Sequence, residues 1–176
     1  MKIEIFTEGS GTTADRDDVE TVLDFFEGGF LPVRDLAMDL EEHGNTTIHV
    51  LSDEFGYVRG SDGVTTLSDS NTQDEVQQFS QAILQASHSA DVLVILLTKS
   101  TFDETVSKQW SEMLSNVNES SICCLGASRS ALSSIEIEKL YTSVDTVIVY
   151  HRVGVARISS EYKKQLVEAV SKKSSV

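Results

Sequence analysis

The run Asp91–Leu97, DVLVILL, restricts the possible folds of this chain more than any other feature. Successive side chains of a strand point to opposite faces of its sheet, and this run is apolar at both sets of positions. Such a strand must be covered on both faces, as in the centre of a parallel sheet between two layers of helices. The run therefore predicts a three-layer α/β domain.

Four more apolar runs have the length and the β-branched composition of buried strands: Lys2–Phe6, Thr47–Leu51, Ile122–Leu125 and Thr146–Tyr150. Helical patterns separate them, and three begin with capping-box pairs: Thr72 with Glu75, Thr101 with Glu104, and Ser133 with Glu136. Further helices are expected over Asp17–Phe26, Leu31–Glu42 and Ser160–Ser171. Strands that alternate with helices pair in parallel through right-handed crossovers. We expect a mostly parallel five-stranded sheet with helices on both faces.

The length of 176 residues and the hydrophobic content of 40% fit one ordinary core. We expect a single α/β domain over residues 1–170 and a polar tail, residues 171–176, that frays. The segment His151–Ser159 is compatible with an extension of the last strand, a bend at Gly154 or a short hairpin.

Acidic residues outnumber basic ones by 28 to 14, which gives a formal charge of −14 and a pI near 4.5. Such a surface repels phosphate backbones and anionic lipids, so generic duplex binding is disfavoured at low salt. Acid spread over solvent faces is also typical of proteins from a saline cytoplasm. The N-terminus does not resemble a signal peptide, and no apolar run approaches the ~20 residues that span a bilayer. We expect a soluble, cytoplasmic protein without membrane partners.

Ligands of open parallel sheets bind outside the carboxyl ends of the strands, so the residues that follow each strand are candidates. Four basic side chains are expected near this edge: Lys99, Arg129, Arg152 and Arg59. Arginine recognises carboxylate or phosphate in bidentate fashion, and small residues such as Ser10 let backbone N–H groups approach an anion. The first loop, Thr7–Asp18, does not match a nucleotide P-loop and permits only a weaker anion nest. We expect a pocket for an anionic small molecule or a nucleic-acid component.

Other kinds of site are not supported. The four histidines are scattered without metal-ligand spacing, which argues against a zinc site. Cys123 and Cys124 are adjacent in a strand, point to opposite faces and are interpreted as buried thiols. Ser52 lacks a glycine-flanked nucleophile elbow, and Trp110 fits the core stripe of a helix. The sequence indicates no particular cofactor or oligomeric state.

The segment Leu51–Asp62, LSDEFGYVRGSD, follows the second predicted strand with glycine, aromatic and charged residues instead of a helix. Its spacing of Ser52, Phe55, Gly56, Arg59 and Asp62 resembles a signature of the YaaA-like family, the peroxide-stress proteins and their smaller α/β relatives. The resemblance implies that these residues line a cationic cleft across the strand ends. The chain lacks the basic DNA-contacting region of longer members and the lysine of their first loop.

The resemblance and the strand-end analysis together suggest a small YaaA-like domain. Such a domain would bind an anionic nucleotide, a nucleobase or a nucleic-acid end, in nucleic-acid modification or stress protection. Asp53 and Glu8 are candidate general acids or bases if the protein is an enzyme. Two alternatives are an acidic, non-catalytic module that binds proteins or regulates them, and a flavodoxin-like flavin carrier.

Overall fold

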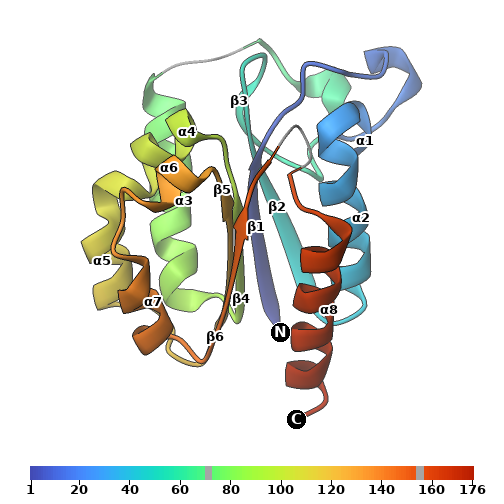
Figure 1. Ribbon diagram of the computed structural model, residues 1–176. Helices are drawn as coiled ribbons and strands as arrows, with labels where there is room; N and C mark the ends of the chain where they lie inside the picture. The colour runs from blue at the N-terminus through green and yellow to red at the C-terminus, as the bar shows by residue number, and fades with distance from the viewer. Residues whose placement is uncertain (70–72, 154–156) are drawn as a thin grey trace.

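The computed structural model describes residues 1–69, 73–153 and 157–176, and these form an α/β domain of three layers (Figure 1). The five predicted runs share one mostly parallel sheet, which confirms the predicted fold class. The sheet has six strands instead of five. The strands are β1 (Lys2–Glu8), β2 (Asn45–Ser52), β3 (Gly56–Arg59), β4 (Val92–Leu96), β5 (Ile122–Ala127) and β6 (Thr146–His151).

The strand order is β3-β2-β1-β4-β5-β6, and β3, antiparallel to β2, is the exception to parallel pairing. Without β3, the parallel strands have the order of a doubly wound, flavodoxin-like sheet. The chain leaves β1 for β2 on one side and later returns to β4 on the other side of β1. The carboxyl ends of β1 and β4 therefore flank the topological switch point, where such sheets bind their ligands.

The sixth strand arises from the segment LSDEFGYVRGSD, which folds as a β-hairpin. The Ser52 hydroxyl accepts hydrogen bonds from the backbone N–H groups of Glu54 and Phe55, and so closes the turn. Phe55 is buried against Phe25, and Gly56 has a φ of 70°, which disfavours residues with a Cβ. Phe55 therefore anchors the turn in the core, and Gly56 provides the backbone geometry that the turn requires.

Helices cover both faces of the sheet. Figure 1 shows one layer on each side, and the core is divided accordingly into two clusters of buried side chains. One layer contains α1 (Val22–Phe25), α2 (Leu31–Glu41) and α8 (Ser160–Ser174). The other contains α3 (Gln73–Ser89), α4 (Lys99–Thr105), α5 (Trp110–Ser115), α6 (Arg129–Leu132) and α7 (Ile137–Ser143). The described ranges also contain the 3-10 turns η1 (Arg16–Asp18), η2 (Gly28–Phe30), η3 (Val64–Thr66) and η4 (Ser107–Gln109).

The central strand β4 packs into both clusters, as its sequence predicts. Val92, Val94 and Leu96 lie in the cluster under α2 and α8, and Leu93 and Ile95 lie in the other. Each is at most 3% exposed. Full burial of one such side chain contributes about 1.5–3 kcal/mol, so this strand anchors both layers.

Several helix boundaries differ from those predicted. The helix expected from Thr101 begins at Lys99 with Thr98 as its N-cap, because the Thr101 hydroxyl bonds Glu8 instead. Ser133 ends α6 rather than starting a helix, and α7 begins at Ile137. Asp17–Phe26 is largely irregular, with the short elements η1 and α1. Thr72 and Gly154 lie outside the described residues.

α8 continues through Ser174, into the segment for which fraying is predicted. The Ser159 hydroxyl caps its start by accepting from the N–H of Tyr162. Near its end, Lys173 Nζ donates to the carbonyl oxygen of Ser120 at 2.5 Å. These contacts tie residues beyond Ser171 to the domain. None of the helices in the described ranges is long and apolar enough to cross a membrane.

Candidate functional site

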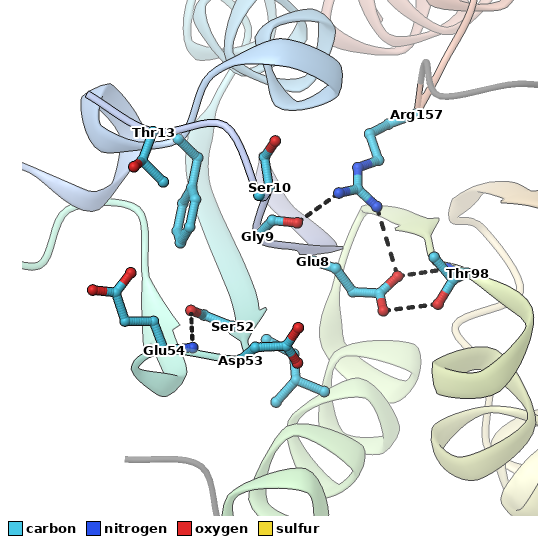
Figure 2. Close-up of a pocket in the computed structure, with 12 residues that line it drawn as sticks. Glu8, Gly9, Ser10, Thr13, Ser52, Asp53, Glu54, Thr98 and Arg157 are labelled. Atoms are coloured by element: carbon cyan, nitrogen blue, oxygen red, sulfur yellow. Dashed lines mark hydrogen bonds and ion pairs between the residues drawn. The ribbon is translucent and has the colours of Figure 1, made fainter. Parts of the chain in front are cut away.

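A crevice of about 400 Å³ lies at the carboxyl ends of β1, β2 and β4, beside the topological switch point. Both its position and its size are typical of small-molecule sites in open α/β sheets. Figure 2 shows Ser52, Asp53 and Glu54 along one side and Arg157 on the other. The described lining residues are Glu8, Gly9, Ser10, Gly11, Thr13, Phe26, Leu51, Ser52, Asp53, Glu54, Thr98 and Arg157.

Glu8, the last residue of β1, is held by several donors. Its carboxylate accepts hydrogen bonds from the Thr98 backbone N–H at 2.6 Å and the Thr98 hydroxyl at 2.8 Å (Figure 2). It also accepts one from the Thr101 hydroxyl at 2.5 Å. Thr98 is the N-cap residue of α4, so Glu8 bonds the residue at which this helix begins. Glu8 therefore fastens the end of β1 to the start of α4 and is not an unengaged base.

Arg157 closes the other side of the crevice and comes from the segment between β6 and α8. Its Nη2 donates to the carbonyl oxygen of Gly9 at 2.6 Å, and its Nη1 lies 3.7 Å from a Glu8 carboxylate oxygen. Arg157 is 7% exposed, and burial, followed by the charge of Arg152, lowers its pKa, which Glu8 partly opposes. Arg157 is not among the site residues that the sequence patterns predict. Its position between apolar residues, in the sequence Val155–Ile158, is the sequence feature that could have indicated a buried arginine.

The β2–β3 turn supplies the remaining carboxylates. Because Ser52 holds the turn by its hydroxyl, Asp53 projects at the surface, and no hydrogen bond or ion pair of its side chain is found among the described residues. Glu54 pairs with Arg16, whose guanidinium also lies 4.6 Å above the Phe55 ring. Asp53 is thus the carboxylate of the crevice that is most available to a ligand.

The charge of this lining differs from the predicted cationic cleft. Among the lining residues that the structure describes, three carboxylates, Glu8, Asp53 and Glu54, face one guanidinium, that of Arg157. Ser10 and Ser52 lie in the crevice as predicted, whereas the predicted cations Lys99, Arg129 and Arg152 are not part of this lining. Lys99 pairs instead with Asp103 at 2.5 Å, one helical turn along α4.

Arg59 does not share a rim with Arg129 and Arg152. Because the hairpin reverses direction, Arg59 lies opposite His49, in the middle of β2. β3 and β6 are opposite edges of the six-stranded sheet, so Arg59 and the end of β6 are separated by five strand spacings, about 24 Å. Arg59 lines a separate hollow of about 390 Å³ beside Glu41. The Asp62 carboxylate accepts from the Arg59 backbone N–H at 2.7 Å and so closes the following turn.

A buried polar network lies beneath α3, apart from the crevice. His49 Nε2 lies 2.6 Å from a Glu4 carboxylate oxygen, and His49 Nδ1 lies 2.6 Å from the Tyr57 hydroxyl. Burial raises the pKa of Glu4, but the hydrogen bond and charge of His49, with those of Lys2, outweigh it and leave the pKa below its ordinary value. Burial raises the pKa of Tyr57. The network satisfies buried polar groups of β1, β2 and β3.

Residues 1–69, 73–153 and 157–176 contain no cluster of three His, Cys, Asp or Glu side chains that could hold a metal ion. Cys123 and Cys124 are buried, and burial raises their pKa values to about 11 and about 12, so both are inert thiols. Comparisons with models of protein families, with characterised proteins and with solved structures gave no significant match.

Proposed function

We propose that the crevice binds an uncharged nucleobase or nucleoside, and that the protein acts on or carries this component of nucleic acid. The charge balance of the lining supports this choice over an anionic nucleotide. Three carboxylates and one guanidinium line the crevice, and even with Glu54 paired to Arg16 the carboxylates exceed the guanidinium groups, which opposes the entry of a phosphate group. The amino and imino groups of a base and the hydroxyls of a ribose are donors, which suit carboxylate acceptors.

The available side chains support a division of roles. Asp53 is exposed and would accept hydrogen bonds from the ligand directly, while Ser10 and Thr13 supply hydroxyls. Leu51, which is half-buried, offers apolar surface to a base. Glu8 would keep the crevice in shape through Thr98 and Arg157. The resemblance of Leu51–Asp62 to the YaaA-like family supports a role in nucleic-acid modification or stress protection.

Calorimetry against a panel of nucleobases, nucleosides, their 5′-monophosphates and FMN tests this proposal. We expect one or more nucleosides to bind, and the corresponding monophosphate to bind at least about fivefold more weakly at low salt, because one added charge pair costs about 1 kcal/mol or more. FMN carries a phosphate and belongs to the excluded class. Tighter binding of the phosphates, or no binding by any uncharged member, would contradict the proposal.

Matched variants locate the binding site. Asp53→Asn removes the exposed charge and should weaken nucleoside binding about tenfold or more, since hydrogen bonds to charged groups contribute about 1.5–3 kcal/mol. Glu112→Gln is the control, because Glu112 is an exposed carboxylate on α5, outside the crevice lining. Equal affinities of both variants and the parent chain would place binding elsewhere.

A further inference from the structure

The outer edge of β6 is a sheet edge without the usual protection against pairing. β6 ends the sheet, and Figure 1 shows it in front of the other strands, with α7 to one side and α8 to the other. Its six residues, TVIVYH, include no Lys, Asp, Glu or Pro. Natural sheets protect exposed edges with such residues, with bulges or with very short strands. This edge is therefore suited to accept another strand.

The opposite edge of the sheet is protected. β3 has four residues and ends in Arg59. The turn that follows β3 is bonded to the segment around α1, since the N–H of Leu23 donates to Gly60 and that of Val22 to Asp62, both at 3.0 Å. The contrast between the two edges shows that the exposure of β6 is specific to that strand.

The geometry of β6 identifies which backbone groups point outward. A residue of a parallel strand directs its N–H and C=O to the same neighbouring strand, and successive residues alternate. The N–H of Arg152 donates to the carbonyl oxygen of Ala127 in β5 at 2.9 Å, so even-numbered residues of β6 face β5. Val147, Val149 and His151 therefore direct their N–H and C=O groups outward. Within the described ranges, no hydrogen bond to these outward groups is found.

We propose that two copies of this chain form a dimer by antiparallel pairing of β6 with β6. The two-fold axis passes between the two copies of Val149. This register places Val149 opposite Val149 and Val147 opposite His151, and pairs all the outward groups in about six hydrogen bonds. The pairing joins the two six-stranded sheets into one continuous sheet. The helices α1, α2 and α8 of both copies then cover one face of this sheet, and α3–α7 of both copies cover the other. The proposal does not depend on the function of the crevice.

Charge supports a second copy as the occupant. β6 carries no Asp or Glu, so this register places no carboxylate of one strand opposite a carboxylate of the other. The residues Val147–Tyr150 of the two copies face each other there, where two copies with a net charge of −14 repel least.

The molecular mass in solution tests the proposal, measured by light scattering in molar KCl, which screens the repulsion between copies. The parent chain should have about twice the monomer mass of 19.3 kDa at submillimolar concentration. Val149→Pro removes only an outward N–H and keeps the β5 ladder, so the variant should fold. Loss of two hydrogen bonds, one from each copy, should raise the dimer dissociation constant about 100-fold. Val149→Ile is the matched control and should remain dimeric.

Two results would overturn this assignment: a monomeric parent chain under these conditions, or a Val149→Pro variant whose dimer dissociation constant equals that of the parent chain. Hydrogen exchange of the parent chain gives an independent test if Val149→Pro fails to fold. The amides of Val147, Val149 and His151 should become protected as protein concentration rises, while the amide of Ile148 should be protected at all concentrations. Protection of the outward amides that does not depend on concentration would argue against the dimer.

Discussion

Arg157 Nη2 donates a hydrogen bond of 2.6 Å to the carbonyl oxygen of Gly9, although 148 residues separate the two in sequence. The bond joins the segment before α8 to the loop after β1, and the same guanidinium faces Glu8. A single buried side chain thereby connects the last helix of the fold to the wall of the crevice. The shape of the candidate site depends on this connection.

Replacement of Arg157 by Met should therefore reduce both stability and ligand binding. Loss of a charged hydrogen bond costs about 1.5–3 kcal/mol, and urea unfolding should show a decrease of this size. Lys164→Met is the stability control, because Lys164 is exposed on α8 and its removal should change the free energy of unfolding by less than about 0.5 kcal/mol. Arg59→Ala is the binding control, because Arg59 lies outside the crevice. An Arg157→Met variant as stable as the parent chain would show that the contact does not hold the loop.

Gly56 should tolerate no larger residue. Its φ is 70°, and a Cβ built there would lie 1.4 Å from a carboxylate oxygen of Glu75. Gly56→Ala should lower the free energy of unfolding by about 2 kcal/mol or more, since backbone strain of 1–3 kcal/mol adds to the displacement of Glu75. Gly11→Ala is the matched control, because a Cβ there meets nothing within 4 Å. Equal denaturation midpoints of the two variants would refute this account of the hairpin.

The pair of Glu4 and His49 should make stability depend on pH in the acid range. The pKa of Glu4 in the folded protein is lower than its ordinary value of 4.5, so the ionised form favours folding. This contribution is fully present above the ordinary pKa and is lost as pH falls through the lower pKa of the folded state. The stability difference between the parent chain and Glu4→Gln should therefore shrink on acidification below about pH 4.5. A difference that stays constant or grows on acidification would contradict this assignment, and Glu112→Gln again provides the surface control.

The regular elements could be predicted from sequence because their patterns are local. The two-faced apolar pattern of Asp91–Leu97 requires cover on both sides, and the structure provides it. The sixth strand was missed because Gly56–Arg59 is short and its pairing depends on the turn that Ser52 closes. The site was only partly predictable for a related reason. Glu8 and Ser52 end strands and Ser10 lies two residues beyond one, whereas Arg157 reaches the crevice through a contact 148 residues distant in sequence.

The direction of β3 explains why the motif analysis misplaced Arg59. A segment that continued across the strand ends would have carried Arg59 toward β4 and β5. The hairpin instead returns it beside His49, at the edge of the sheet. The spacing of Ser52, Phe55, Gly56 and Arg59 is compatible both with a segment across the strand ends and with a hairpin. The hairpin forms because Gly56 adopts a positive φ and Phe55 is buried.

The excess of acid predicts that salt stabilises the fold. With 28 acidic and 14 basic residues, the folded chain brings like charges closer together than the unfolded chain does, and this repulsion opposes folding. The screening length falls from about 10 Å at 0.1 M to about 3 Å at 1 M, so the midpoint of thermal unfolding should rise over this range of KCl and then level off. Potassium sulfate at equal ionic strength should give the same rise if screening is the cause, whereas preferential exclusion of sulfate would give a larger and continuing one. A midpoint that is unchanged or falls with KCl would show that the acidic surface is not under electrostatic strain, and the interpretation of the composition as an adaptation to salt would then be wrong.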